Sequence, residues 1–335
     1  MDINITSNLA EIKPFFYHMV EEQIPTIFVG APGTGKSQTL KAWVGERDWN
    51  YLSFVPSFAK PSQIGGIQIP DVKNSSCEFL YIELMKKIFD ATETTVVHVQ
   101  DLLQAPDTIA KQIMSLIEFR EVNGTPIPDC VSFVLDTNDP SHRAGAGTVL
   151  GTTNNRCSII EWPVDVKGWL EWAVSSGRIA REVILFIHAN PDFLCSKEVP
   201  RGFTPYNTPR SWEKLSKAVS GGFTSFPFVQ SFVGNEAASR FCPFLESLKD
   251  YGNLIAKIKA DPDSAPTFDG NEFDRILGSI FILSNHFEKA NVDKFIRYIN
   301  RYSNREYTAL LFELGVQVHP DSKETKAYVD YITNK

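Results

Sequence analysis

Residues 30–37 read GAPGTGKS and fit the pattern G-x-x-x-x-G-K-[ST]. The apolar run Pro25–Val29 comes directly before them and predicts a short buried strand. After them, Leu40, Trp43 and Val44 share one face of a predicted helix. In this order of strand, loop and helix, backbone N–H groups and the helix N-terminus can surround phosphate oxygens. The stretch therefore predicts a phosphate-binding loop.

Two side chains of this loop have defined chemical roles in such a site. Lys36 is expected to reach the β- and γ-phosphates, and the Ser37 hydroxyl is expected to ligate Mg²⁺. The alternative is a glycine-rich turn without a ligand, which the strand before and the helix after disfavour. The predicted nucleotide-binding residues are Gly30, Pro32, Gly33, Thr34, Gly35, Lys36, Ser37 and Gln38.

Four further apolar runs predict strands that alternate with helical patterns. They are Tyr51–Val55, Val96–Val99, Val131–Leu135 and Ser158–Trp162. The clearest helical pattern lies between the second and third of them, over Thr108–Phe119. Strands alternating with helices imply a parallel sheet covered on both faces, which is an α/β fold. Asn123-Gly124, flanked by Val122 and Ile127, predicts a tight hairpin turn.

After about Val164, helical patterns replace the strand patterns. The clearest are Val166–Ser175, Ile179–His188 and Ser211–Val219. Glycines at 177, 221 and 222 stand where these helices would end. We therefore predict two domains, an α/β nucleotide-binding domain over residues 1–164 and a helical domain over residues 165–335.

Composition narrows the class of protein. The net charge of −7 disfavours a general nucleic-acid binder, although a local basic groove stays open. The five cysteines are scattered without a C-x-x-C pair, which favours reduced thiols in a cytosolic protein over a zinc site or a disulfide framework. Neither a signal peptide nor a membrane span is expected.

Polar side chains follow two of the predicted strands. Gln100 and Asp101 come directly after Val96–Val99, and Asn138 ends the strand that begins with Val131–Leu135. Ligand groups gather at the carboxyl ends of strands in open α/β sheets, so Asp101 and Asn138 are expected at the nucleotide. Because Asn-Asp-Pro is also a turn-forming sequence, an ordinary loop is the alternative for Asn138.

Taken together, these residues resemble AAA+ ATPases of the MoxR-like branch, and most closely the phage and prophage members of that branch. The resemblance extends over nearly the whole chain and implies a P-loop NTPase domain followed by a helical lid and a C-terminal helical extension. Beyond the phosphate-binding loop, the segments that carry it are Pro61–Pro70, Ala105-Pro106, Asn123-Gly124, Arg143–Gly147, Asn155-Arg156, Thr208–Trp212 and Val233–Ala238.

The resemblance also implies roles for single residues. By likeness, Asn138 is the first sensor, Arg156 is an arginine finger acting on the neighbouring subunit's nucleotide, and Arg210 is the second sensor facing the γ-phosphate. Arg143 and Arg201 are weaker finger candidates. An arginine finger can raise the rate of phosphoryl transfer by about 10³- to 10⁵-fold. The alternative for any one of these arginines is a surface salt bridge, which contributes little.

The same likeness implies cofactors and partners. They are ATP and Mg²⁺, a ring of identical subunits that is typically a hexamer, and a partner protein with a von Willebrand factor A domain. A phage-encoded chain would work in the host cytoplasm.

Gln100 departs from the family pattern, in which two acids end this strand. Aligned on Ala105-Pro106, Gln100 holds the first acidic position and Asp101 the second. Glutamine keeps a carbonyl oxygen but carries no charge. Losing a charge-assisted hydrogen bond costs about 1.5–3 kcal/mol, or about ten- to a hundredfold in rate. We therefore expect Ser37, Gln100 and Asp101 around the metal. A second register, in which Asp101 takes the Mg²⁺ position and no base follows, stays open.

These expectations lead to three functions in order of preference. The first is an ATPase that acts as an oligomeric remodelling motor or assembly chaperone, slowed by Gln100, with Asp101, Asn138, Arg156 and Arg210 as catalytic residues. The second is an ATP-gated switch with vestigial hydrolysis. The third is a DNA-linked motor, which the acidic balance disfavours. His98, a lone histidine among valines, is expected to be a core residue.

Overall fold

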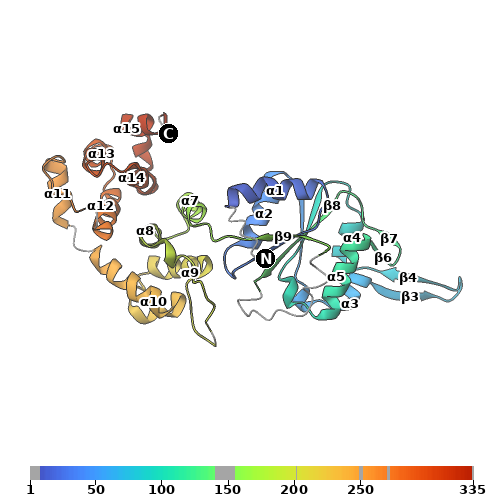
Figure 1. Cartoon of the computed structure of the whole chain (residues 1–335). Coiled ribbons are helices and arrows are strands. Elements are labelled where there is room, and N and C mark those ends of the chain that lie inside the picture. The colour runs from blue at the N-terminus through green and yellow to red at the C-terminus, as the bar shows by residue number, and fades with distance from the viewer. Residues whose placement is uncertain (1–7, 140–154, 201, 249–251, 270–271, 334–335) are drawn as a thin grey trace. The chain divides into compact units, whose positions relative to one another are not determined.

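The computed structural model describes residues 8–139, 155–200, 202–248, 252–269 and 272–333 (Figure 1). The chain divides into two compact units, Met1–Asp165 and Val166–Lys335. Each unit is described separately below.

A five-stranded sheet forms the centre of the first unit, with strand order β2-β5-β8-β1-β9. Every neighbouring pair in it is parallel, so the carboxyl ends of all five strands lie at the same edge. The predicted α/β class is therefore confirmed. The strands are β1 (Thr26–Gly30), β2 (Asn50–Phe54), β5 (Thr95–Val99), β8 (Val131–Asn138) and β9 (Ser158–Glu161).

Helices cover both faces of this sheet. Since successive side chains of a strand point to opposite faces, Phe28 packs with α1 (Leu9–Glu21) and α2 (Lys36–Glu46). Its neighbour Ile27 packs with side chains of the helices on the other face. Those helices are α3 (Pro61–Gly65), α4 (Glu83–Phe89) and α5 (Asp107–Phe119). Figure 1 shows helices on both sides of the sheet. The interior strands β1, β5 and β8 are therefore buried on both faces, which accounts for their mainly apolar sequences.

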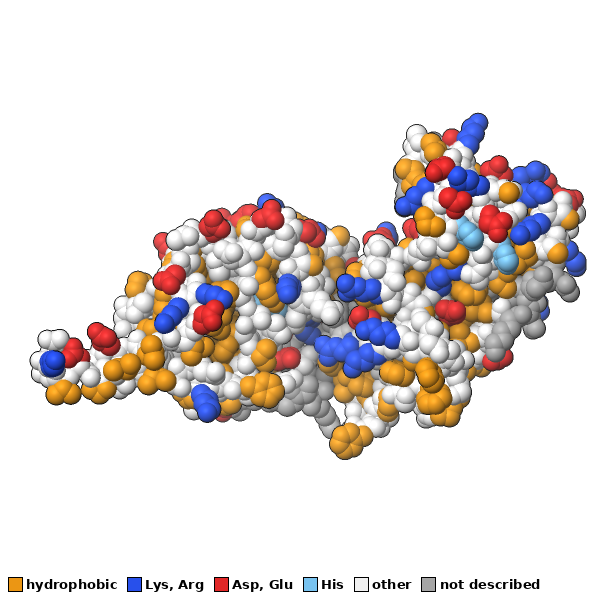
Figure 2. Space-filling view, turned by 180° about the vertical axis from the view of Figure 1, so that it is seen from behind, with side chains coloured by type: hydrophobic (Ala, Val, Ile, Leu, Met, Phe, Trp, Pro, Cys, Tyr) orange, Lys and Arg blue, Asp and Glu red, His pale blue; other side chains and the backbone are white. Residues whose placement is uncertain are grey.

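Two hairpins extend from this layered core. The short one joins β6 (Glu121–Val122) to β7 (Thr125–Pro126) through the predicted Asn123-Gly124 turn. The longer one pairs β3 (Ile67–Asp71) with β4 (Ser76–Leu80) and was not predicted. Figure 2 shows apolar side chains at the surface along the longer hairpin, where the exposed ones are Ile67, Ile69, Val72 and Leu80.

The described part of the second unit contains helices and no strand. Its core includes the fully buried Phe186, Trp212, Phe241 and Phe287. The helices are α7 (Val166–Ser176), α8 (Arg181–Ala189), α9 (Pro209–Ser220), α10 (Phe226–Ser247), α11 (Gly252–Ala260), α12 (Phe273–Asn285), α13 (Val292–Asn300), α14 (Arg305–Val318) and α15 (Lys326–Thr333). Among the helices that the structure describes, none is long and apolar enough to cross a membrane.

Candidate nucleotide site

The predicted phosphate-binding loop lies between β1 and α2. Strand β1 ends at Gly30, and α2 begins at Lys36 with Gly35 as its N-cap in a left-handed conformation (φ 88°). A side chain at position 35 would be strained by this φ, so glycine is needed there. The Thr34 hydroxyl donates to the Ala31 carbonyl oxygen at 2.8 Å and closes the loop on itself. The loop therefore leads directly into a helix N-terminus, the arrangement that binds phosphate.

Position 30 requires glycine because Trp162 lies very close to its Cα, and not because of its backbone angles. A Cβ at this position would lie 2.8 Å from both the Cβ and the carbonyl oxygen of Trp162. The Trp162 side chain is buried and packs edge-on against Phe28. Only a residue without a side chain lets the end of β1 lie this close to β9 and its continuation.

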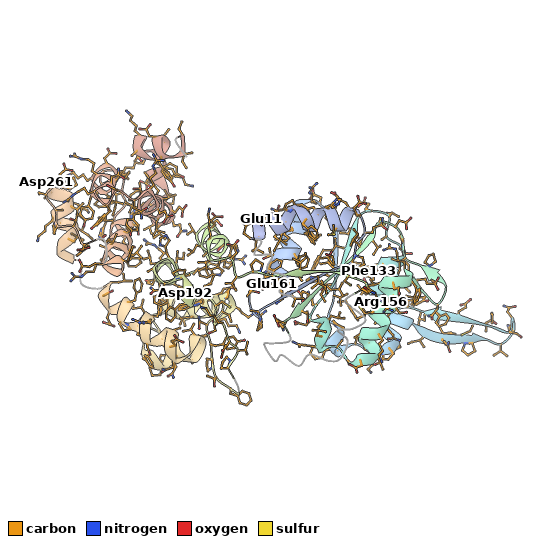
Figure 3. All side chains as sticks on the ribbon, in the orientation of Figure 1. Glu11, Phe133, Arg156, Glu161, Asp192 and Asp261 are labelled. Atoms are coloured by element: carbon orange, nitrogen blue, oxygen red, sulfur yellow. The ribbon has the colours of Figure 1, made fainter. Side chains whose placement is uncertain are left out.

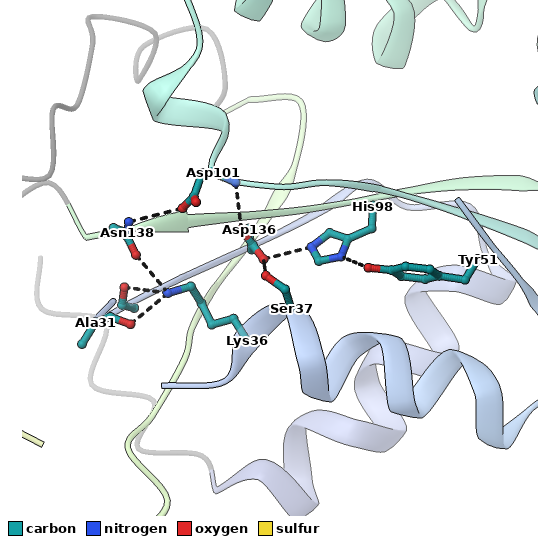
Figure 4. Close-up of polar contacts among 9 residues, drawn as sticks. Ala31, Lys36, Ser37, Tyr51, His98, Asp101, Asp136 and Asn138 are labelled. Atoms are coloured by element: carbon teal, nitrogen blue, oxygen red, sulfur yellow. Dashed lines mark hydrogen bonds and ion pairs between the residues drawn. The ribbon is translucent and has the colours of Figure 1, made fainter. Parts of the chain in front are cut away.

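Lys36 is folded back onto the loop. Its ammonium donates to the carbonyl oxygens of Gly30 at 3.0 Å and Ala31 at 2.9 Å, and to Asn138 Oδ1 at 3.3 Å (Figure 4). Lys36 is buried, so its positive charge is held at the loop by these acceptors. The positive charge of Lys36 is therefore held at the phosphate-binding loop.

Asn138 connects this lysine to Asp101. Its amide Nδ2 donates to Asp101 Oδ1 at 3.2 Å, while its Oδ1 accepts from Lys36. Asp101 adopts a left-handed backbone conformation (φ 51°) directly after β5, where the chain turns into a short 3₁₀ helix over Leu102–Gln104. The structure thus brings together three of the predicted residues, Lys36, Asp101 and Asn138, at the carboxyl edge of the sheet.

The Ser37 hydroxyl has a partner that the sequence did not indicate. It donates to Asp136 Oδ2 at 2.6 Å. Asp136 lies within β8, and only 1% of its surface is exposed. The backbone N–H of Asp101 donates to the other carboxylate oxygen, Oδ1, at 2.9 Å. The apolar run Val131–Leu135 begins this strand, which ends at Asn138 and contains Asp136, a residue for which no role was predicted.

His98 completes the environment of this carboxylate. Its Nε2 lies 3.0 Å from Asp136 Oδ2, and its Nδ1 lies 2.7 Å from the Tyr51 hydroxyl (Figure 4). Because an ionised carboxylate only accepts hydrogen bonds, Nε2 carries the hydrogen. Nδ1 is the ring nitrogen that hydrogen-bonds with the Tyr51 hydroxyl. His98 is therefore a fully buried core histidine with both ring nitrogens satisfied.

Opposing effects act on the pKa of Asp136. Burial raises the pKa of this carboxyl, but the hydrogen bond and the charge of His98 lower it. The hydrogen bonds from Ser37 and from the Asp101 N–H lower it further. The net result is a pKa below the usual range of an aspartic acid. Asp136 is therefore a carboxylate at neutral pH.

The Gln100 side chain is directed to the far end of the same network. It hydrogen-bonds with the Tyr51 hydroxyl, which offsets part of the increase that burial causes in the pKa of Tyr51. Within the described residues the Ser37 hydroxyl donates to Asp136 and not to Gln100. The polar group that contacts the loop serine therefore comes from β8, the neighbour of β5 in the sheet.

Among the predicted arginines, Arg156 has a partner outside this cluster. Arg156 forms an ion pair with Glu118 of α5 at 2.6 Å, with both side chains about one-third exposed, and Figure 3 places Arg156 beside that helix. Arg210 is exposed in the first turn of α9, in the second unit. Arg143 and Arg201 lie outside the described residues. Gln38 is exposed one residue beyond Ser37.

The donor set around Ser37 fits a magnesium–nucleotide complex. Hard oxygen ligands suit Mg²⁺, which is usually held by one or two carboxylates, phosphate oxygens and water rather than by an all-protein cage. Within the described ranges, no group of three or more His, Cys, Asp or Glu side chains could hold a metal alone. The Ser37 hydroxyl, hydrogen-bonded to the buried carboxylate of Asp136, instead suits a metal whose other ligands come from a nucleotide and water.

The parallel sheet, the loop between its interior strand β1 and helix α2, and the polar ends of β5 and β8 define an α/β P-loop NTPase fold. No family model and no curated protein matches the chain.

Solved structures that align with the chain include RuvB from Thermotoga maritima, described as a Holliday junction branch migration motor. It shares 12% identity over 74% of this chain and 77% of that chain, with a TM-score of 0.41. A mutant of the same RuvB shares 12% identity over 76% of this chain and 79% of that chain, with a TM-score of 0.42. Similarity at this level carries no information on activity.

Proposed function

We propose that the chain binds Mg²⁺–ATP at the loop of residues 30–37 and hydrolyses it to ADP and phosphate. The observation that carries this proposal is the hydrogen bond from the Ser37 hydroxyl to the buried carboxylate of Asp136, 2.6 Å long, beside the Lys36–Asn138–Asp101 chain. A phosphate-binding loop alone would serve storage or sensing of a nucleotide. A loop with a cation, an amide and carboxylates at its edge has the groups that phosphoryl transfer needs.

Each residue has a proposed role in this reaction. The loop residues hold the phosphates through their N–H groups, and Lys36 leaves the Gly30 and Ala31 carbonyl oxygens to bind the β- and γ-phosphates. Asp101 and Asn138 position the attacking water beside the γ-phosphate. Ser37, with Gln100 and Asp101, would hold Mg²⁺, which when bound supplies positive charge to the phosphate oxygens.

The proposed working form is a ring of identical subunits, a hexamer by resemblance. Arg156 would exchange its ion pair with Glu118 for the nucleotide of the neighbouring subunit, and Arg210 of the proposed lid would face the γ-phosphate. Arginine suits both roles because its planar fork matches phosphate oxygens. By the MoxR-like resemblance, the ring acts in the cytoplasm as a remodelling motor or assembly chaperone, with a partner carrying a von Willebrand factor A domain.

Gln100 favours one alternative, an ATP-gated switch in which hydrolysis is vestigial. In that case ATP binding alone would assemble or reshape the protein. The two functions differ in turnover and not in affinity, so both must be measured on the same preparation.

The test is steady-state ATP turnover with Mg²⁺ over a range of protein concentrations. We expect a rate per subunit that climbs with concentration and is lost in both Lys36→Ala and Arg156→Ala. The matched control is Lys111→Ala, which removes an exposed lysine of α5 and should leave the rate unchanged. Tight ATP binding without turnover at any concentration would refute the ATPase and leave the switch. Absence of ATP binding would refute both.

A further inference from the structure

The register of two strands places Asp136 beside the position where the family pattern has its first acid. Strands β5 and β8 pair in parallel, with Thr95 opposite Val131 and Val99 opposite Leu135. The same offset, continued by one residue, puts Gln100 opposite Asp136. Directly opposite side chains of neighbouring strands lie on the same face of a sheet, close enough to replace one another in a site.

The direction of the hydrogen bond to Ser37 is the one that a metal ligand requires. Asp136 accepts at both oxygens, from Ser37 and His98 at Oδ2 and from the Asp101 N–H at Oδ1. The hydrogen of the Ser37 hydroxyl therefore points at Asp136, and the oxygen lone pairs are left for a cation. A carboxylate behind a metal ligand orients that ligand and raises its basicity.

Burial argues against a purely structural carboxylate. A charged side chain in an otherwise apolar strand is costly unless it is paired and hydrogen-bonded. Asp136 is 1% exposed and is satisfied by three donors from three different elements: α2, β5 and the turn after β5. Buried ionised groups with several specific partners occur preferentially at functional sites.

From these observations we propose that Asp136 supplies from β8 the metal-site carboxylate that Gln100 does not supply from β5. It acts as a positioning residue, through the Ser37 hydroxyl. His98 and Tyr51 hold its orientation from behind through their hydrogen bonds. This inference rests on the proposed binding of Mg²⁺–ATP, and it assigns the residue on which the magnesium dependence of that binding depends.

The experiment measures how much Mg²⁺ strengthens nucleotide binding, independently of turnover. The quantity is the ratio of the Kd of a fluorescent, non-hydrolysable ATP analogue in EDTA to its Kd in Mg²⁺, determined for the full chain. Apparent Mn²⁺ affinity with the same analogue, followed by electron paramagnetic resonance, is a second readout. We expect Asp136→Asn to lower the Kd ratio about 10- to 100-fold, the range found when groups behind metal ligands are changed.

Relocating the charge separates a metal role from a structural one. The double variant Asp136→Asn with Gln100→Asp returns a carboxylate to β5 and should restore the ratio to within about threefold of wild type. A purely structural Asp136 would leave the double variant as impaired as the single one, and that result would overturn the proposal.

A second variant does not depend on the stability of Asp136→Asn. Ser37→Ala removes the hydroxyl through which Asp136 is proposed to act, so we expect it to lower the Kd ratio about 10- to 100-fold as well. A Kd ratio within about threefold of wild type would mean that no carboxylate acts on the metal through Ser37, contrary to the proposal.

The failure of this inference is distinguishable from failure of the proposed function. Wild-type protein that binds no nucleotide in Mg²⁺ would refute the proposed function and the inference with it. Wild-type protein that binds and hydrolyses Mg²⁺–ATP, together with an Asp136→Asn variant of unchanged Kd ratio, would refute the inference alone.

Discussion

A methyl group added at Gly30 tests how closely the end of β1 approaches Trp162. The new Cβ would lie 2.8 Å from the Cβ and 2.8 Å from the carbonyl oxygen of Trp162, whereas carbon atoms pack at about 3.5–4.0 Å. The strands would have to separate by about 1 Å. The Trp162 N–H is hydrogen-bonded to the Val29 carbonyl oxygen at 2.7 Å, and its buried ring contacts Trp43 at a centroid distance of 5.6 Å. Neither its backbone nor its ring can move freely.

We therefore expect Gly30→Ala to destabilise the first unit. Overpacking of this kind costs about 1–3 kcal/mol. For a unit of this size each kcal/mol lowers Tm by about 2–4 °C, so the expected decrease is about 2–12 °C. The assay is thermal unfolding followed by circular dichroism and tryptophan fluorescence.

The matched control is Gly45→Ala. Gly45 is an exposed glycine within α2, and a Cβ there would meet no atom within 4 Å. The same methyl group should raise stability by about 0.4–1 kcal/mol, because alanine restricts the unfolded chain more than glycine does. The two variants therefore should shift Tm in opposite directions. A Gly30→Ala protein that melts at or above the wild-type temperature would contradict the close approach of β1 and Trp162.

Three further predictions concern single side chains. Arg156→Ala removes an ion pair with Glu118 whose side chains are about one-third exposed, worth about 0–1 kcal/mol. Tm should therefore change by less than about 4 °C while turnover is lost, and a large Tm decrease would indicate a structural role instead. Burial raises the pKa of the Cys157 thiol to about 11, so about 0.1% of this thiol is thiolate at pH 8. Iodoacetamide should therefore label the exposed Cys77 before Cys157, as measured by peptide mass spectrometry. Equal labelling rates at the two cysteines would contradict the burial of Cys157. The pKa of Asp136 is lowered in the folded protein, so the stability that its carboxylate contributes is complete above about pH 4 and is lost as pH falls through the folded-state pKa. The urea unfolding midpoints of wild type and Asp136→Asn should therefore converge from pH 7 to pH 3. A constant difference between the two midpoints would contradict this assignment.

The α/β class could be predicted because its signals are local. Each strand of the sheet is a short apolar run, and the loop motif fixes what lies before and after it. The β3–β4 hairpin gave no such signal, because Ile67, Ile69 and Leu80 are all exposed and no buried face imposes a period on the sequence. A helix was also not predicted over Glu83–Phe89, which has only Met85 and Ile88 buried.

The candidate site could be predicted in part for a similar reason. Lys36, Asp101 and Asn138 each stand at the end of a strand or the start of a helix, and parallel strands bring such positions to one edge. The Ser37–Asp136 bond joins residues far apart in sequence and depends on strand register, which no local pattern records. One signal was present, the acid Asp136 between the apolar run Val131–Leu135 and Asn138, but no role was predicted for it.

The register of β5 and β8 has a consequence for how this site could change in evolution. By this register positions 100 and 136 lie opposite one another on adjacent strands, so under the proposal above a carboxylate at either position would serve the site without a change of backbone. Homologous chains would then preserve one acid at the pair of positions rather than an acid at either position alone. Covariation between the two columns, with acid at 136 when 100 is neutral and the reverse, is the pattern that such an exchange would leave. A motif search that inspects only the end of β5 would class such chains as inactive, although their site is complete in three dimensions.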